Sequence, residues 1–408
     1  MKKLILLILL NFAVFFSLYS LESLSLEESL IDAAKKGELE TIKKLISSGV
    51  KIRYKDQHGL NALHYAAIYN KTNIIELLVL SGIHINSTTR WSARWDTPLT
   101  IAAKENHIDA VRALLDIYHK KVDLTNKSNV ELIENEKRQA LRYAIENNNV
   151  NLVRFLLEAS TNGEKMEVNY GWVDRLLGHS NSLFTYAVAR DKIDIVKLLL
   201  ESGADVNYQN IEGVTALMVA VSEGLYDRAE LLINAGADVN LKTSYWSRYP
   251  GSTALIAAAI VGSGTKFIEL LIANGADINA QDDKGMTAIM YAVTKKHLLI
   301  LTEFLIEKGA NLLLKNKDGF TVLDLAQKQA DSYGKSILGP LASEAKKTAE
   351  AKAVVDLLEP EIKKATEAKA LYEDRMAAES EAEAKAEAEA EKRRNFSYSP
   401  FGILKKDF

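Results

Sequence analysis

The sequence predicts an all-α repeat solenoid of about nine helix-pair units, with loops projecting between the units and a charged helix toward the C-terminal end. Three observations lead to this prediction: an apolar pattern that recurs along most of the chain, glycines that close the units, and a change of composition after residue 330. At 408 residues the chain exceeds one ordinary compact core, so several domains or a repeat array are expected.

The N-terminal residues have the pattern of an export signal. Lys2 and Lys3 precede an uncharged stretch, residues 4–21, which is 18 residues long. A basic start followed by an apolar stretch is typical of secretory signals, while roughly 20 apolar residues span a bilayer. Residues 1–23 are therefore expected to be a signal peptide or, if uncleaved, a membrane anchor. The protein is accordingly expected to be exported, either periplasmic or secreted, with membrane anchoring through residues 4–21 as the alternative.

The recurring pattern is a leucine-like residue followed three positions later by alanine. Its occurrences are Leu30/Ala33, Leu63/Ala66, Leu99/Ala102, Leu141/Ala144, Phe184/Ala187, Leu217/Ala220, Leu255/Ala258, Ile289/Ala292 and Leu323/Ala326. From the second unit on, a polar side chain suited to capping a helix start stands two positions before the leucine-like residue. These residues are Asn61, Thr97, Gln139, Ser182, Thr215, Thr253, Thr287 and Thr321. Each unit is therefore expected to begin with a helix.

A second helix is expected to end each unit. Paired aliphatic residues at helical spacing, such as Leu77-Leu78 and Leu231-Leu232, follow the alanine, and in six units a glycine comes 16 or 17 residues after it. Glycine suits the left-handed conformation in which many helices end. The six glycines are Gly49, Gly82, Gly203, Gly236, Gly275 and Gly309. Units three and four depart from this pattern and carry Tyr118 and Ser160 at the corresponding place.

These motifs resemble those of the ankyrin-repeat family, whose pattern is D-x-x-G-x-T-P-L-H-x-A-A with a closing G-A-D-V-N. DQHGLNALHYAA begins at Asp56, TPL at Thr97, GADVN at Gly203 and Gly236, and GADIN at Gly275. The resemblance covers roughly residues 26–330 and implies stacked helix pairs that bind a partner protein. We therefore expect an ankyrin-repeat domain over residues 24–330, because one helix pair cannot bury its apolar face without neighbours.

The residues after the repeats differ sharply in composition. Residues 331–395 are rich in Ala, Glu and Lys, which favours helix, and residues 396–408 form a tail with more aromatic side chains. Pro360 is expected to divide the helix into two pieces, because proline lacks the backbone N–H that a helix interior uses. The coiled-coil signal is weak because apolar heptad positions are missing after Glu381, so a solvated helix is expected.

Composition and motifs argue against several classes of function. The chain has no cysteine, and its net charge of -3 offers no broad positive field for nucleic acid. The seven histidines are scattered, and the segment GSGTK at Gly262 lacks the residue order of a phosphate-binding loop. We therefore expect no enzyme activity, no metal site and no cofactor.

The feature that points most directly to binding is the position of the tryptophans. All four lie in enlarged loops between units, together with tyrosines and arginines. Trp, Tyr and Arg supply most of the energy in protein interfaces. The predicted contact residues are Trp91, Trp95, Trp172, Tyr245, Trp246 and Tyr249, with Arg90, Arg94 and Arg248. A second interpretation stays open, in which each tryptophan folds back and anchors its own loop.

The sequence therefore predicts a non-catalytic protein-protein interaction module, a scaffold or adaptor, outside the cytoplasm. Two alternatives remain. One is a membrane-tethered structural spacer, in which residues 4–21 anchor the chain and the charged helix sets a distance. The other is a secreted effector directed at a host. In each case the expected partner is another protein, with no nucleic acid and no membrane contact except through an uncleaved N-terminal segment.

Overall fold

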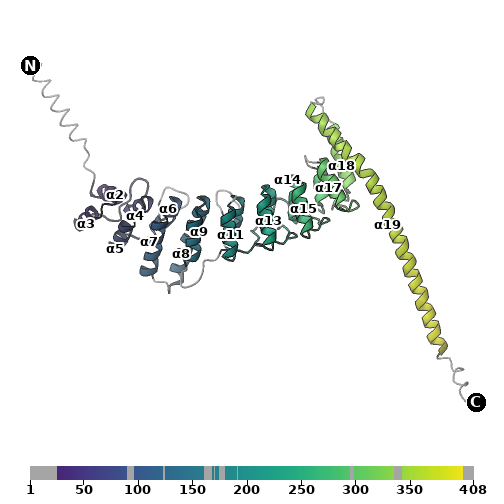
Figure 1. Ribbon diagram of the computed structural model, residues 1–408, viewed down its shortest axis with the longest axis horizontal. Helices are drawn as coiled ribbons and strands as arrows, with labels where there is room; N and C mark the ends of the chain where they lie inside the picture. The colour runs from purple at the N-terminus through teal and green to yellow at the C-terminus, as the bar shows by residue number, and fades with distance from the viewer. Residues whose placement is uncertain are drawn as a thin grey trace, which may run out of the picture. The chain divides into compact units, whose positions relative to one another are not determined.

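The computed structural model describes residues 25–89, 96–122, 125–159, 168–169, 171–173, 180–190, 192–294, 298–334 and 342–397. The chain divides into two compact units, one ending at Asp205 and the other beginning at Val206. Both consist of successive helix pairs (Figure 1). The predicted all-α solenoid with finger loops and a charged C-terminal helix is confirmed.

Among the described residues, the first unit contains five helix pairs. They are α2 (Leu26–Lys36) with α3 (Leu39–Ser47), α4 (Ala62–Ile68) with α5 (Thr72–Leu80), α6 (Pro98–Lys104) with α7 (Ile108–Lys121), α8 (Lys127–Glu146) with α9 (Val150–Glu158), and α10 (Leu183–Ala189) with α11 (Ile193–Glu201). First helices pack on first helices, as α2 does on α4 and α4 on α6, while α5 packs on α7. Each pair therefore shares its core with its neighbours.

The second unit continues the same arrangement. Its pairs are α12 (Ala216–Ser222) with α13 (Tyr226–Asn234), α14 (Ala254–Val261) with α15 (Thr265–Ala273), and α16 (Ala288–Thr294) with α17 (Leu298–Glu307). They are followed by α18 (Val322–Gly334) and the long α19 (Ala342–Ser397), drawn from green to yellow in Figure 1. No helix among the residues described here combines the length and the apolar composition needed to cross a membrane.

The recurring leucine and alanine positions form the core, as the sequence predicts. Leu63, Ala66, Leu255 and Ala258 are each at most 1% exposed. The predicted caps also hold: the side-chain oxygens of Asn61, Thr97, Ser182, Thr215 and Thr253 accept backbone N–H groups at the starts of α4, α6, α10, α12 and α14. Short first helices thus begin at a defined residue.

The closing glycines adopt the left-handed conformation, with φ between 81° at Gly49 and 106° at Gly82. The asparagine of each GADVN or GADIN motif in the second unit then links adjacent turns. Asn240 Nδ2 donates to the Gly275 carbonyl at 2.9 Å, and Asn240 Oδ1 accepts from the Asp277 N–H at 2.9 Å. This repeated exchange fixes the spacing of successive loops in that unit.

The fourth helix pair corrects one prediction. Gln139 does not cap a helix but lies inside α8, which begins at Lys127 with Asn126 as its N-cap. The preceding α7 is also long and runs to Lys121 past Tyr118, where other units have their closing glycine. Helix α7 thus extends three residues past Tyr118 and α8 has 20 residues, whereas α9, whose unit also lacks the glycine, keeps 9 residues.

Two features lie outside the helical pattern or at its end. Strands β1 (Gly171–Val173) and β2 (Ser180–Ser182) form a short antiparallel pair in the first unit.

Helix α19 is continuous through Pro360, so the predicted break is wrong. Its early turns pack against α17 and α18 and bury Ala351, Val354 and Leu358, whereas residues 366–390 are exposed. The solvated interpretation therefore holds only beyond the docked turns.

Candidate protein-binding surface

The predicted contact residues that the structure describes in most detail lie in the loop before α14, residues 241–252. Thr243 closes this loop on itself. Its N–H donates to the Ser252 carbonyl at 2.9 Å, and its hydroxyl donates to the Tyr249 carbonyl at 2.6 Å. The Gly251 N–H donates back to the Thr243 carbonyl at 3.0 Å. The loop is therefore a hydrogen-bonded finger with residues 244–250 at its tip.

Backbone contacts tie this finger to the finger before it. Ser244 donates its N–H to the Glu212 carbonyl at 2.8 Å and its hydroxyl to the Ile211 carbonyl at 2.9 Å. Gly213, with φ +71°, makes this approach possible, because a Cβ there would collide with the Ser244 backbone. A non-glycine residue would also be strained in this conformation.

The finger is tied in the same way to the one that follows. The Asp283 N–H donates to the Pro250 carbonyl at 3.0 Å. At Gly251, whose φ is +75°, a Cβ would lie 2.7 Å from the Asp283 nitrogen. Three successive fingers are thus held in contact through their backbones, and their side chains are presented from a fixed support, which lowers the entropy lost on binding.

The aromatic side chains of the finger have two different roles. Tyr245 and Trp246 are 80% and 75% exposed, and their rings meet edge to face at 5.9 Å. Tyr249 is half-buried and packs its edge on Tyr291 at 5.9 Å. The anchoring interpretation therefore fits Tyr249, whereas Tyr245 and Trp246 are presented to solvent. Ile211 on the preceding finger is 61% exposed.

Tyr291 in turn fixes the following finger. Its hydroxyl donates to Asp282 Oδ2 at 2.7 Å, while Asp282 Oδ1 accepts the N–H groups of Lys284 and Met286, both at 2.8 Å. Burial and then the Asp282 carboxylate raise the pKa of Tyr291 well above its usual value. The tyrosine is therefore a neutral donor at physiological pH, and it connects a first helix to the base of a finger.

The open face of α14 continues the apolar character. Ala257, Ile260 and Val261 lie at i, i+3 and i+4, so they share one side of the helix, and Val261 is 47% exposed. The equivalent positions of α12 are Val219, Ser222 and Glu223.

Tyr291 occupies the position in α16 that Ala257 occupies in α14, so the contact between Tyr249 and Tyr291 shows that fingers adjoin this helix face. We call Ile211, Tyr245, Trp246, Arg248, Ile260 and Val261 the finger–α14 surface.

The first unit contains a buried polar cluster that sequence patterns did not reveal. Glu136 is 3% exposed, and its Oε2 accepts the hydroxyls of Tyr118 at 2.8 Å and Thr97 at 3.0 Å. Among the described residues, its Oε1 has no hydrogen-bond partner. Burial raises the pKa of Glu136 to about 7, against the opposing effect of the two hydroxyls.

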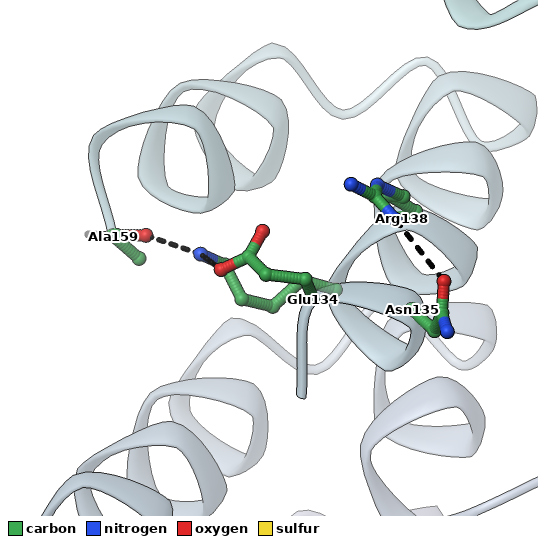
Figure 2. A network of polar contacts seen from close by, with 5 residues as sticks. Glu134, Asn135, Arg138 and Ala159 are labelled. Carbon is green, nitrogen blue, oxygen red and sulfur yellow. Dashed lines mark hydrogen bonds and ion pairs between the residues drawn. The ribbon is translucent and has the colours of Figure 1, made fainter. Parts of the chain in front are cut away.

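The neighbouring lysine is buried as well. Lys137 Nζ donates to Glu134 Oε1 at 2.9 Å and to the Ala159 carbonyl at 2.6 Å (Figure 2). Burial lowers the pKa of Lys137, and Glu134 opposes that shift. On the other side of α8, Arg138 donates to Asn135 Oδ1 at 3.1 Å. Lys137 is fully buried, and its bond to the Ala159 carbonyl fastens α8 to the end of α9.

The family model for ankyrin repeats (3 copies) matches residues 16–89, 90–170, 165–243 and 246–348. Together these segments cover most of the chain. The chain belongs to the ankyrin-repeat family. Ankyrin repeats are protein-protein interaction modules.

Several ankyrin-repeat relatives are similar over part of their length. The ankyrin repeat protein nuc-2 of Neurospora crassa is 28% identical over 298 residues, covering 70% of this chain and 25% of the relative. The B-cell lymphoma 3 protein homolog of Mus musculus is 28% identical over 247 residues, 60% of this chain and 50% of the relative. A putative ankyrin repeat-containing protein of Treponema pallidum is 35% identical over 145 residues, 35% of this chain and 46% of the relative.

The chain thus spans a quarter to a half of the length of these relatives. Among solved structures, the crystal structure of the ankyrin repeat domain of Bcl-3 matches with a TM-score of 0.48 and 25% identity. That match covers 60% of this chain and 97% of the other.

The remaining predicted contact residues of this ankyrin-repeat protein lie in the first unit. Arg90, Trp91, Arg94 and Trp95 are outside the described residues. Trp172 lies in β1, opposite Asn181 of β2. A binding role for these five residues stays a prediction.

The histidine of the repeat motif is structural. His64 is fully buried, and its Nδ1 lies 2.7 Å from Asn61 Oδ1 at the start of α4. Burial lowers the pKa of His64 to about 4, so the ring is neutral at pH 7. In the described part of the chain, no group of three or more His, Asp or Glu side chains could hold a metal ion.

The sequence indicated Tyr245, Trp246 and Arg248 as contact residues but not the aliphatic residues of the finger–α14 surface, and a binding role for all of them stays a prediction. The available signal was the segment ALIAAAIV at 254–261, which is apolar on every side. A helix that is apolar all round is normally buried all round, so the same composition on a helix with one open face indicates a binding surface.

Proposed function

We propose that this chain is an exported ankyrin-repeat protein of bacterial type that binds a partner protein outside the cytoplasm through its finger–α14 surface. The observation that carries the binding site is the exposure of Tyr245 and Trp246 on a finger whose backbone is fixed to both neighbouring fingers. Export is supported by Lys2 and Lys3 followed by the uncharged residues 4–21.

The physical basis for binding is the combination of aromatic area and rigidity. Large aromatic side chains bury much apolar area with few rotatable bonds, so their immobilisation costs little. Because the finger is already hydrogen bonded, no loop ordering opposes association. Trp91, Trp95 and Trp172, with Arg90 and Arg94, are proposed to extend the contact on other fingers.

The test is a capture experiment from an envelope extract of the source cells, with the purified chain as bait and mass spectrometry as readout. The Trp246→Ala variant should lose the captured protein. Tyr372→Ala is a matched control, because it removes another exposed aromatic ring (63%) far along α19. If Trp246→Ala and Tyr372→Ala capture the same proteins as the natural chain, the proposed site is wrong.

A spacer role is the second candidate, favoured by α19. Residues 366–397 of this helix lie beyond the docked turns, and at 1.5 Å per residue they extend about 48 Å. A mature chain that retains residues 1–23 in the membrane fraction would support a tethered spacer. Recovery of the chain from culture medium would instead support a secreted effector.

A further inference from the structure

We propose that the finger–α14 surface recognises a linear peptide segment in which isolated carboxylates alternate with aliphatic or aromatic side chains. This inference rests on the proposed function and specifies the chemistry of the partner. Three observations carry it: the purely aliphatic face of α14, exposed cations without an ion pair on the finger before α14 and the finger after it, and acidic side chains on the two adjoining fingers.

The aliphatic face defines the apolar half of the partner. Ala257, Ile260 and Val261 carry no polar side-chain atom, and Val261 and Ile211 are 47% and 61% exposed. A polar partner segment would lose its hydration there without gaining a hydrogen bond from these side chains. Aliphatic or aromatic partner side chains are therefore favoured at this face.

Arg248 defines the charged half. Its side chain is exposed, and its guanidinium carbon lies 5.7 Å from the centre of the Tyr249 ring. Within the described ranges, Arg248 forms no ion pair. A guanidinium presents paired N–H donors that match a carboxylate, so an acidic side chain of the partner is the fitting acceptor.

The same finger and the finger after it add two similar cations, Lys242 and Lys284. Lys242 donates to the Gln281 carbonyl at 2.9 Å and Lys284 is exposed, and neither forms an ion pair with a described residue. Glu212 and Asp283 lie on the adjoining fingers and would repel a uniformly acidic chain. The surface therefore fits separated carboxylates among apolar residues rather than a run of acidic ones.

The extent of the surface favours a peptide segment over a small ligand. It draws on the finger before α12, the finger before α14 and α14 itself, and stacked helices lie roughly 10 Å apart. The backbone hydrogen bonds between these fingers hold them in one arrangement. A peptide of several residues, unlike a small ligand, can contact side chains on two neighbouring fingers.

The experiment is selection of a random 12-residue peptide library on the purified full chain, followed by affinity measurement for the enriched peptides. Enriched peptides should carry Asp or Glu next to Leu, Ile, Phe or Trp. Trp246→Ala should weaken their binding about 30-fold, the effect expected of a central aromatic contact. Arg248→Gln should weaken it about 10-fold at low salt and less at high salt. Tyr372→Ala should change nothing.

Substitution in the peptide gives an independent readout that does not depend on folding of the variants. Replacing each acidic residue of an enriched peptide by its amide should weaken binding to the natural chain about as much as Arg248→Gln does. The amide peptide should bind Arg248→Gln and the natural chain equally, because the ion pair is then absent from both.

Several outcomes would overturn the inference. These are failure to enrich any peptide, enrichment without acidic residues, amide peptides that bind unchanged, and a chain dimer at micromolar concentration that Trp246→Ala abolishes. If extract capture still depends on Trp246 while the peptides show no acidic preference, only the peptide chemistry is wrong. If neither assay depends on Trp246, the proposed binding site is wrong as well.

Discussion

Two junctions between successive repeats differ in what they do with their side chains. One joins α7 to α8 in the first unit, and the other is the finger around residue 245 in the second unit. At Tyr118 the closing glycine is absent, α7 continues, and Glu136 and Lys137 become buried. At Gly236 the glycine is present, the turn is regular, and the following finger presents Tyr245 and Trp246 to solvent. The junction at α7 thus places charged side chains in the core, whereas the enlarged loop after Gly236 leaves aromatic side chains exposed.

The largest expected effect is a loss of stability when the buried Lys137 is replaced. Lys137→Ala should destabilise the chain by about 4 kcal/mol, because it leaves Glu134 and the Ala159 carbonyl without their donor and creates a cavity. Urea denaturation followed by circular dichroism measures the loss. Lys137→Met, which keeps the volume, should lose less. Equal stability of all three chains would show that this contact is not part of the core.

The second expected effect is a dependence of the chain's stability on pH. The pKa of Glu136 is about 7 in the folded chain and about 4.5 when unperturbed, so its stabilising contribution is complete below pH 4.5 and is lost as the pH rises toward 7. The difference corresponds to about 3 kcal/mol. Glu136→Gln should remove this dependence and be the more stable chain at pH 8.

The comparison must be made between Glu136→Gln and the natural chain at each pH. His64, whose folded pKa is lowered to about 4, acts in the opposite direction, because its contribution is lost as the pH falls below 6.5. The two effects partly cancel in the natural chain. A stability difference between the two chains that is constant from pH 5 to pH 8 would contradict the raised pKa.

The third prediction concerns the close approach of fingers. Gly251→Ala should cost about 2 kcal/mol, because the new Cβ would be strained at φ +75° and would meet the Asp283 backbone. Gly236→Ala is the matched control: its φ is +91°, but its Cβ would meet no atom within 4 Å. It should cost only about 1 kcal/mol. Equal losses would indicate that the fingers are not held in contact.

The smallest expected effect distinguishes presented from anchoring aromatic residues. Trp246→Ala should change stability by less than about 0.5 kcal/mol, as is usual for exposed side chains. Tyr249→Ala should cost about 1.5 kcal/mol through loss of its edge contact with Tyr291. Thermal denaturation of both variants tests this. A larger loss for Trp246→Ala than for Tyr249→Ala would reverse the two roles.

Much of the fold could be predicted because repeated burial leaves a repeated pattern. Leu63 with Ala66 and caps such as Thr97 recur at fixed offsets, and the structure confirms them. The prediction that Gln139 caps a helix was wrong because the leucine and alanine pattern marks only the buried face of α8. The helix itself starts twelve residues before Gln139. Pro360 misled because packing on neighbouring helices offsets one missing hydrogen bond.

The site was predictable only in part, for a different reason. Exposed aromatic residues such as Trp246 stand out in a sequence because they are rare outside cores. The face of α14 could not be separated from core by composition, since Ile260 and Ile256 differ only in what covers them. Glu136 was not recognised because a charged residue in a helix usually indicates a solvent-facing side, and its hydrogen-bond partner Tyr118 lies 18 residues away on another helix.

The docking of α19 sets where this chain can be shortened. Ala351, Val354 and Leu358 belong to the packed end of the array although their segment is rich in charge. A protein cut before residue 342 would expose the faces of α17 and α18 that these residues cover, and repeat arrays without a covered end lose solubility. A protein cut after residue 366 would keep that cover and lose only the exposed part of the helix.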